Sequence, residues 1–178
     1  LNRLREQAEG DPSLQRMLAE GLQQAGMNQW SLRSGNRGDI EDAIAKWEES
    51  IQIADNVYAG DVTDLKSLIL CIRGRSLLVD AYRRIGLDEK RRSRLSEAET
   101  LADQLPNPMG EQEQALLLMG VLLDRSRLVP NEGNPEESPP FARMLELIDS
   151  LNNAYPDNEW IHRESTLVWN RLSYAWAQ

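Results

Sequence analysis

Helix-breaking residues recur at a constant spacing along this chain of 178 residues, and that spacing limits the folds open to it. The breakers stand 48 positions apart at Pro12, Gly60, Pro108 and Pro156. A second series lies between them, in which Gly38 precedes Gly86 by the same interval. A fixed period of this kind is typical of repeat proteins, in which each period is one supersecondary unit that stacks on its neighbours.

The apolar and small side chains repeat at the same interval. The pairs separated by 48 positions are Trp47 and Leu95, Ser50 and Ala98, Ile53 and Leu101, and Ala54 and Ala102. The two chain ends also match in this register, 144 positions apart, as Leu1 and Leu145, Leu4 and Ile148, and Pro12 and Pro156. We therefore expect one repeat domain over 1–178, with units of about 13–60, 61–108 and 109–156 and a partial unit at 157–178.

Apolar residues within the units follow the spacing of one helix face, as in the run Leu65, Leu68, Ile69 and Ile72. No stretch alternates apolar and polar residues for long enough to predict a strand. The pattern predicts an all-α fold made of helical hairpins, with a short helix at 1–9. The seven longer helices are expected at 12–34, 39–58, 61–85, 88–105, 109–128, 139–154 and 157–177.

Capping residues support these helix starts. A side-chain oxygen precedes each predicted helix, at Asp11, Asp39, Asp61, Asp88, Asn107, Ser138 and Asp157, where it can accept from the free N–H groups of the first turn. Prolines are expected at first helical positions, where a missing N–H costs nothing, at Pro12, Pro108 and Pro139. Residues 129–138, with two prolines and three acids, predict the one long loop.

With these motifs in place, the sequence resembles the tetratricopeptide repeat family. In the segment 38–51, the residues Gly38, Ala43, Trp47 and Ser50 occupy the offsets of the family's second helix. The next unit matches at Tyr82, Gly86, Leu95 and Ala98, although Arg91 replaces the expected small residue. The last helix looks like the family's first-helix pattern, from Trp169 through Leu172 and Ser173 to Trp176.

The resemblance implies a right-handed α-solenoid of stacked antiparallel hairpins that binds a partner segment on its concave face. The chain departs from the family in its unit of 48 residues, against the usual length of about 34, and the third unit, 109–156, matches poorly. Arrays with such long first helices occur in large bacterial signalling proteins. The resemblance therefore implies a protein–protein interaction or scaffolding module of a signalling or regulatory protein.

Composition excludes several other classes of protein. The formal net charge of -9 disfavours generic binding to nucleic acid or to an anionic membrane, and the longest apolar run, 68–72, is too short to span a bilayer. The chain starts at Leu1 with no signal-like segment, so we expect a cytoplasmic protein and interpret the sequence as a piece of a longer one.

Candidate chemistry is sparse. The single cysteine, Cys71, excludes an internal disulfide and a zinc cage, and the single histidine, His162, excludes paired-histidine metal sites. We interpret Cys71 as an inert core residue and His162 as an ordinary surface or interface residue. We expect no catalysis, no cofactor and no bound metal. A helical hydrolase that uses acidic residues with a metal remains a remote alternative.

Basic residues gather in one stretch of this acidic chain. Residues 72–94 hold eight basic and three acidic side chains, a net charge of +5 against -14 for the rest. Mapping onto the family's first helix places seven residues towards the concave groove: Arg73, Asp80, Arg83, Arg84, Asn28, Gln29 and Asn170. The stretch is a solvated face with salt bridges to acidic neighbours, or a patch for an acidic peptide, carboxylate or phosphate, and nucleic acid is the least favoured ligand. Arg91 and Arg92 are expected to face solvent.

A stripe of apolar residues marks the last predicted helix. Trp169, Leu172 and Trp176 lie three and seven positions apart and so share one face. This stripe either packs between hairpins or stays exposed and binds another chain. An oligomerisation or intramolecular docking element is therefore the alternative to a concave groove that binds a separate protein.

Overall fold

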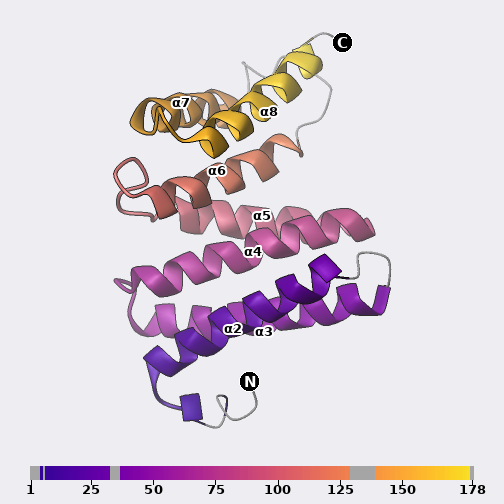
Figure 1. The fold of residues 1–178 in the computed structure, drawn as a ribbon, viewed down its shortest axis with the longest axis vertical. Helices are drawn as coiled ribbons and strands as arrows, with labels where there is room; N and C mark the ends of the chain where they lie inside the picture. Colours follow the sequence, from indigo (N-terminus) through magenta and orange to yellow (C-terminus); the bar gives the residue numbers. More distant parts are fainter. Residues whose placement is uncertain (1–4, 6, 33–36, 129–138, 177–178) are drawn as a thin grey trace. The chain divides into compact units, whose positions relative to one another are not determined.

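The computed structural model describes residues 5, 7–32, 37–128 and 139–176, with side chains described for 5, 7–30, 40–128 and 144–170. The described residues form helices and turns and contain no strand, which confirms the all-α prediction (Figure 1). The longer helices are α2 (Pro12–Leu32), α3 (Arg37–Gly60), α4 (Leu65–Ile85), α5 (Asp88–Ala102), α6 (Gln112–Ser126), α7 (Pro139–Ala154) and α8 (Glu159–Trp176). The predicted loop at 129–138 and most of the predicted helix at 1–9 lie outside the described residues.

The helices divide into two compact units, Leu1–Asp103 and Gln104–Gln178. In the first unit, α3 packs against both α2 and α4, and α5 packs against α4. In the second unit, α6, α7 and α8 all pack against one another. Neighbouring helices therefore pack in chain order within the first unit, as hairpins do. The division into 48-residue repeats of one domain stays a prediction.

The ends of the helices follow the expected capping chemistry in part. Asp11 accepts from the backbone N–H groups of Ser13 and Leu14 at 2.8 and 3.1 Å, and Pro12 is the first residue of α2. Helix α4 begins later than predicted, because Asp64 and not Asp61 caps it by accepting from the Ser67 N–H at 3.3 Å. Asp61 instead accepts from Thr63 within the preceding turn. A capping side chain must stand next to the first free N–H groups of its helix. Because a turn occupies the residues after Asp61, these groups and their cap lie three residues later in the chain.

The same shift occurs elsewhere. Asn158 caps α8 by accepting from the N–H groups of Trp160 and Ile161, in place of the predicted Asp157. Helix α6 begins at Gln112, after a turn that contains both Asn107 and Pro108, so the prediction that Pro108 is a first helical residue is wrong. Two further predicted caps, Asp39 and Asp88, lie within α3 and α5 and so do not precede the starts of these helices, and the predicted cap Ser138 lies outside the described residues. Local sequence therefore placed the helices but located their first residues only to within a few positions.

Helix α4 ends in a left-handed residue. Gly86 has a φ of 74° and its N–H donates to the carbonyl of Tyr82, and the N–H of Leu87 donates to the same carbonyl at 2.9 Å. Glycine adopts this conformation without the clash that a Cβ would cause, so it closes the last turn of α4. The tight stop lets α5 start at Asp88 and return along α4, as Figure 1 shows.

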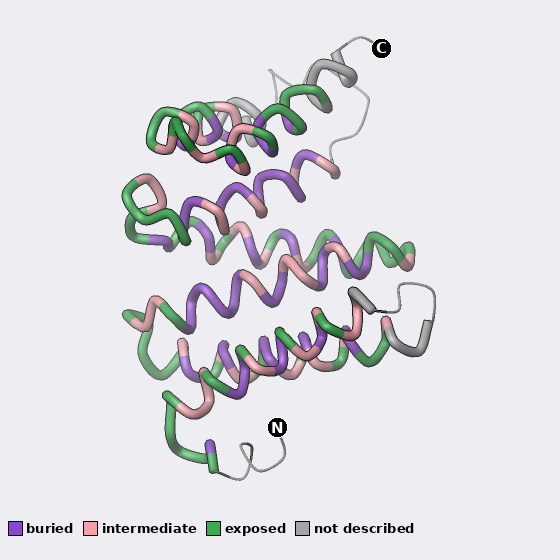
Figure 2. Tube along the Cα trace, viewed as in Figure 1, coloured by how far each residue is buried: buried purple, intermediate pink, exposed green. Residues whose placement is uncertain are grey.

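Some pairs of residues that stand 48 positions apart in the first unit have similar burial. Trp47 of α3 and Leu95 of α5 are 1% exposed each, and Ser50 and Ala98 are 0% exposed each, whereas the buried Ile51 has the partly exposed Glu99 as its counterpart. Figure 2 shows the buried residues of these helices on the sides that meet their neighbours. Arg91 is the counterpart of the fully buried Ala43, and it is 7% exposed. The expectation that Arg91 faces solvent is therefore wrong, because its position on the helix matches a core position.

Candidate functional site

Three of the predicted groove residues meet at the C-terminal end of α4. Asp80 accepts from Arg83 through one oxygen, Oδ1, at 3.2 Å from Nε and 2.6 Å from Nη2. Its other oxygen, Oδ2, accepts from Arg84 Nε at 3.1 Å. The side chains of Asp80, Arg83 and Arg84 are 30%, 41% and 45% exposed. Positions three and four residues apart share one helix face, which is why the sequence alone brings these groups together.

A tryptophan that the sequence analysis did not select completes this group. The guanidinium of Arg84 lies 4.5 Å from the ring centroid of Trp30, which belongs to α2. Trp30 is half-buried and meets the ring of the buried Trp47 edge-on, with 5.7 Å between the ring centroids. A guanidinium over an indole face is held by a cation–π attraction of about 0.5–1 kcal/mol at exposed sites. We call the group Asp80, Arg83, Arg84 and Trp30 the arginine pair site.

The other groove candidates of the first unit make no hydrogen bond to the residues of this site in the described part of the chain. Arg73 shares the face of α4 that carries Asp80 and Arg84, but 11 residues separate it from Arg84, about 16 Å along the helix axis. On α2, Asn28 is exposed and accepts from Gln24 at 3.0 Å. Gln29 accepts from Lys46 of α3 at 2.7 Å, so its amide is turned to the helix within its own hairpin.

The candidates of the second unit belong to α8. Trp169 and Asn170 are exposed, with Trp169 at 36%, and the neighbouring Val168 is fully buried. Leu167 is also 40% exposed, but a residue two positions away on a helix points to a different side, so it does not share the surface of Trp169. The side chain of Trp176 lies outside the described residues, so the predicted stripe is described only at its start.

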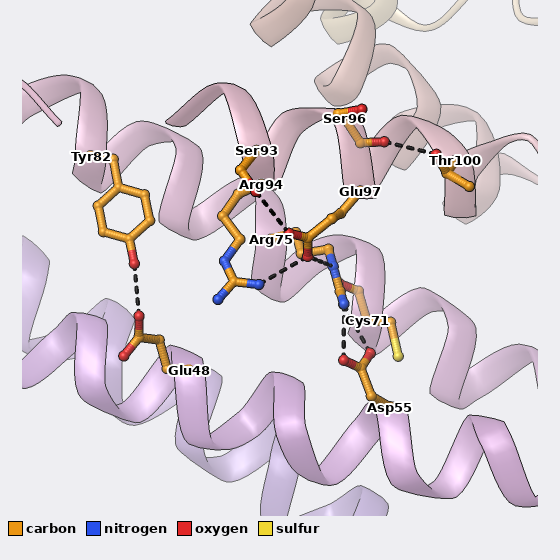
Figure 3. A network of polar contacts seen from close by, with 10 residues as sticks. All are labelled: Glu48, Asp55, Cys71, Arg75, Tyr82, Ser93, Arg94, Ser96, Glu97 and Thr100. Carbon is orange, nitrogen blue, oxygen red and sulfur yellow. Dashed lines mark hydrogen bonds and ion pairs between the residues drawn. The ribbon is translucent and has the colours of Figure 1, made fainter. Parts of the chain in front are cut away.

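A buried arginine, which the sequence analysis counted only as one charge of the basic stretch, joins three helices (Figure 3). Arg75 of α4 donates two hydrogen bonds to the carboxylate of Asp55 on α3, both at 2.9 Å. Its Nε donates to Glu97 on α5 at 2.9 Å, and its Nη1 also donates to the carbonyl of Cys71 at 3.1 Å. The side chain of Arg75 is 9% exposed, so both carboxylates neutralise a charge that burial would otherwise penalise.

The outer part of this network reaches the surface. Glu97 also accepts from Arg94 at 2.9 Å and from Ser93 at 3.2 Å. Burial acts to raise the pKa of the Glu97 carboxyl, but hydrogen bonds from Arg94 and Arg75 outweigh it and lower the pKa. Nearby, the hydroxyl of Tyr82 donates to Glu48 at 2.8 Å (Figure 3). These contacts tie side chains of α3, α4 and α5 together, and we assign them a structural role.

The two candidates for nucleophile or imidazole chemistry have structural environments. Cys71 is fully buried, which confirms its assignment to the core, and burial together with the carboxylate of Asp55 raises the pKa of its thiol. His162 lies in the first turns of α8, where its Nε2 stands 2.6 Å from the carbonyl oxygen of Pro156. Among the side chains that the structure describes, no three acidic, cysteine or histidine residues gather in a way that could hold a metal ion.

Comparisons of the chain with family models, curated proteins and solved structures find no match. In the described ranges, no helix has both the length and the apolar character needed to cross a bilayer. The arrangement of the chain's own side chains is therefore the guide to its function. The arginine pair site is the described group that combines exposure, positive charge and hydrogen bonds of defined geometry.

Proposed function

We propose that this chain is a non-catalytic protein–protein interaction module that binds an acidic segment of a partner at the arginine pair site. In this proposal the hairpins α2–α3 and α4–α5 are units of a right-handed array like that of tetratricopeptide repeats, within a larger signalling or regulatory protein of the cytoplasm. The proposal involves no cofactor.

One observation carries the proposal: two adjacent guanidinium groups stand at the surface with defined orientations. Guanidinium groups match carboxylates and phosphates, because they offer parallel N–H donors in a planar fork. Arg84 is held over Trp30, so a ligand that binds it meets a partly ordered donor. Two other cations of the stretch, Arg75 and Arg91, are less suitable because they are only 8% and 7% exposed.

The exposure of this site sets the strength that we expect of it. Truncating a fully desolvated arginine in an interface weakens the free energy of binding by about 2–5 kcal/mol. Arg83 and Arg84 are more than a third exposed, so the smaller range of surface ion pairs applies, about 0–1 kcal/mol for each. The module would therefore bind weakly and reversibly, and its affinity would fall as salt screens the charges.

Binding of a fluorescently labelled hexaglutamate peptide, measured by anisotropy, tests the proposal. Arg83→Ala and Arg84→Ala should each weaken binding by up to about fivefold, and hexaglutamine should bind much more weakly than hexaglutamate. Arg92→Ala is the matched control, because Arg92 is exposed on α5 and its substitution removes one positive charge outside the site. Equal weakening by all three variants would show a diffuse charge effect and would refute a defined site.

A second function is favoured by the exposed Trp169 on α8. Trp169 is 36% exposed and begins the predicted apolar stripe, and Leu167, which is 40% exposed, lies two positions away on another side of the helix. We propose self-association through α8 as the alternative. Light scattering over a concentration series should then show a dimer that Trp169→Ala dissociates. A monomer at all concentrations would refute the alternative and leave the arginine pair site unaffected.

A further inference from the structure

We infer that Asp80 is an internal occupant of the arginine pair site, and that a partner binds by displacing it with a dianionic group. The inference rests on the proposed function, whose ligand class it narrows. In the unbound chain, Asp80 already fills the positions that a partner's anion would take, because it accepts from both arginines. Binding at this site is therefore an exchange of one anion for another.

The geometry of Asp80 supports this exchange. Each of its oxygens accepts from a different guanidinium: Oδ1 accepts from Arg83 and Oδ2 accepts from Arg84. The carboxylate thus bridges two like charges that would otherwise repel each other. Among the described residues, Asp80 is bound by these two neighbours on its own helix, and it is 30% exposed, so it can turn to water when another anion arrives.

The exchange selects for charge. A single partner carboxylate would replace the bonds of Asp80 with equivalent ones and would gain little. A phosphoserine or phosphothreonine carries about -1.5 to -2 charges and three strong acceptor oxygens, and so offers more to two guanidiniums than Asp80 does. Two adjacent carboxylates on one segment supply the same charge. We therefore expect a segment with a phosphorylated residue or a Glu-Glu pair, and a comparison of peptides distinguishes these two sources.

The structural alternative is that Asp80 only offsets the charges of α4. Arg83 and Arg84 lie in the last turn of this helix, where cations interact favourably with the helix dipole. If that were their whole role, removing the charge of Asp80 would change the stability of the chain but not its affinity for anions. Affinity therefore separates the two roles, and thermal unfolding of each variant shows whether the fold is intact.

Asp80→Asn is the decisive variant, and Glu89→Gln is its control, since Glu89 is an exposed carboxylate near the start of α5. Three labelled peptides serve as probes: Ala-Ala-phosphoserine-Ala-Ala, Ala-Ala-Glu-Glu-Ala and Ala-Ala-Ser-Ala-Ala. Asp80→Asn should tighten binding of the phosphopeptide or the Glu-Glu peptide about two- to fivefold, the range of one surface ion pair. Glu89→Gln should change it clearly less, and neither variant should affect the neutral peptide.

Each other result has a defined meaning. Unchanged or weaker binding by Asp80→Asn, with Arg83→Ala still weakening it, would overturn the exchange and leave the proposed function intact. Equal tightening by Asp80→Asn and Glu89→Gln would overturn the exchange as well, because it would show only the loss of a negative charge. If the unsubstituted chain and all its variants bind the charged peptides with the same affinity as the neutral peptide, the proposed function fails together with the exchange.

Discussion

The indole Nε1 of Trp47 donates a hydrogen bond to the backbone carbonyl of Gln23, 3.1 Å away, across the α2–α3 hairpin. Trp47 is 1% exposed and belongs to a buried cluster with residues of α4. The same side chain thus fixes the distance between two helices of one hairpin and fills the space against the next helix. A single residue therefore joins the α2–α3 hairpin to helix α4 in the packing of the first unit.

We expect Trp47→Ala to lower the free energy of unfolding by about 3–5 kcal/mol, since it opens a large cavity and leaves the Gln23 carbonyl without this donor. Urea unfolding followed by circular dichroism measures the change. Trp169→Ala is the control and should cost clearly less, because Trp169 is 36% exposed. A cost for Trp47→Ala below about 1 kcal/mol would contradict the burial of this ring.

Gly26 lies against Trp47, and a side chain there has no room. A Cβ placed on Gly26 would overlap the indole of Trp47, at 2.8 Å from its Cε2 atom, whereas a Cβ on Gly120 of α6 would have no atom of the described residues within 4 Å. Alanine is the better helix former by about 1 kcal/mol, so Gly120→Ala should stabilise the chain. Gly26→Ala should destabilise it, because the clash exceeds that gain. Thermal unfolding measures both variants. A change in stability of the same sign for Gly26→Ala and Gly120→Ala would refute the close contact.

Removing the side chain of Arg75 should lower the free energy of unfolding by more than removing an arginine on the surface. Truncating one member of a buried ion pair costs about 3–5 kcal/mol. The carboxylates of Asp55 and Glu97 are 42% and 36% exposed and can be hydrated, so we expect Arg75→Ala to lie near the low end of that range. Arg92→Ala, on the surface of α5, should cost less than about 0.5 kcal/mol. Similar losses for both variants in urea unfolding would argue against the three-helix network.

Stability should fall in acid partly through Asp64. Burial acts to raise the pKa of this carboxyl, but hydrogen bonds from Ser67 and Arg16 lower it below its ordinary value. A folded pKa below the unfolded one means that the unfolded chain binds more protons, so this contribution is complete above about pH 5 and is lost as pH falls through the folded pKa.

Asp64→Asn should therefore flatten the dependence of unfolding free energy on pH between about pH 5 and pH 2. Asparagine also caps helices well, so the variant separates the loss of charge from the loss of the cap. Glu20→Gln, at an exposed position of α2, is the control. An unchanged slope for Asp64→Asn would contradict the assigned shift.

The thiol of Cys71 should react only when the chain opens. It is fully buried, and its raised pKa keeps it protonated at neutral pH, whereas the thiolate is the reactive form. A thiol reagent should label native protein slowly and unfolded protein fast. Cys71→Ala should leave hexaglutamate binding unchanged. Rapid labelling of the native chain would show that the thiol is accessible.

Helix positions were predictable from sequence because the signals for them are local. Apolar spacing, prolines at first positions and a glycine after the last turn act within one or two turns, so the predicted ranges overlap every described helix. The burial shared by Trp47 and Leu95 was also predictable, since a 48-residue interval places both on equivalent faces. The contact of Asp80 with Arg83 and Arg84 follows from helix geometry alone.

Contacts between helices were decided only by tertiary structure. No spacing pairs Arg84 with Trp30, which lie 54 positions apart on α4 and α2, and none assigns Arg75 to carboxylates of α3 and α5. Arg91 looked like a surface charge by its type but occupies a core position. A side chain's local pattern determines its helix and its face, but the neighbouring helix that meets this face depends on how whole helices pack, which no short segment of the sequence encodes.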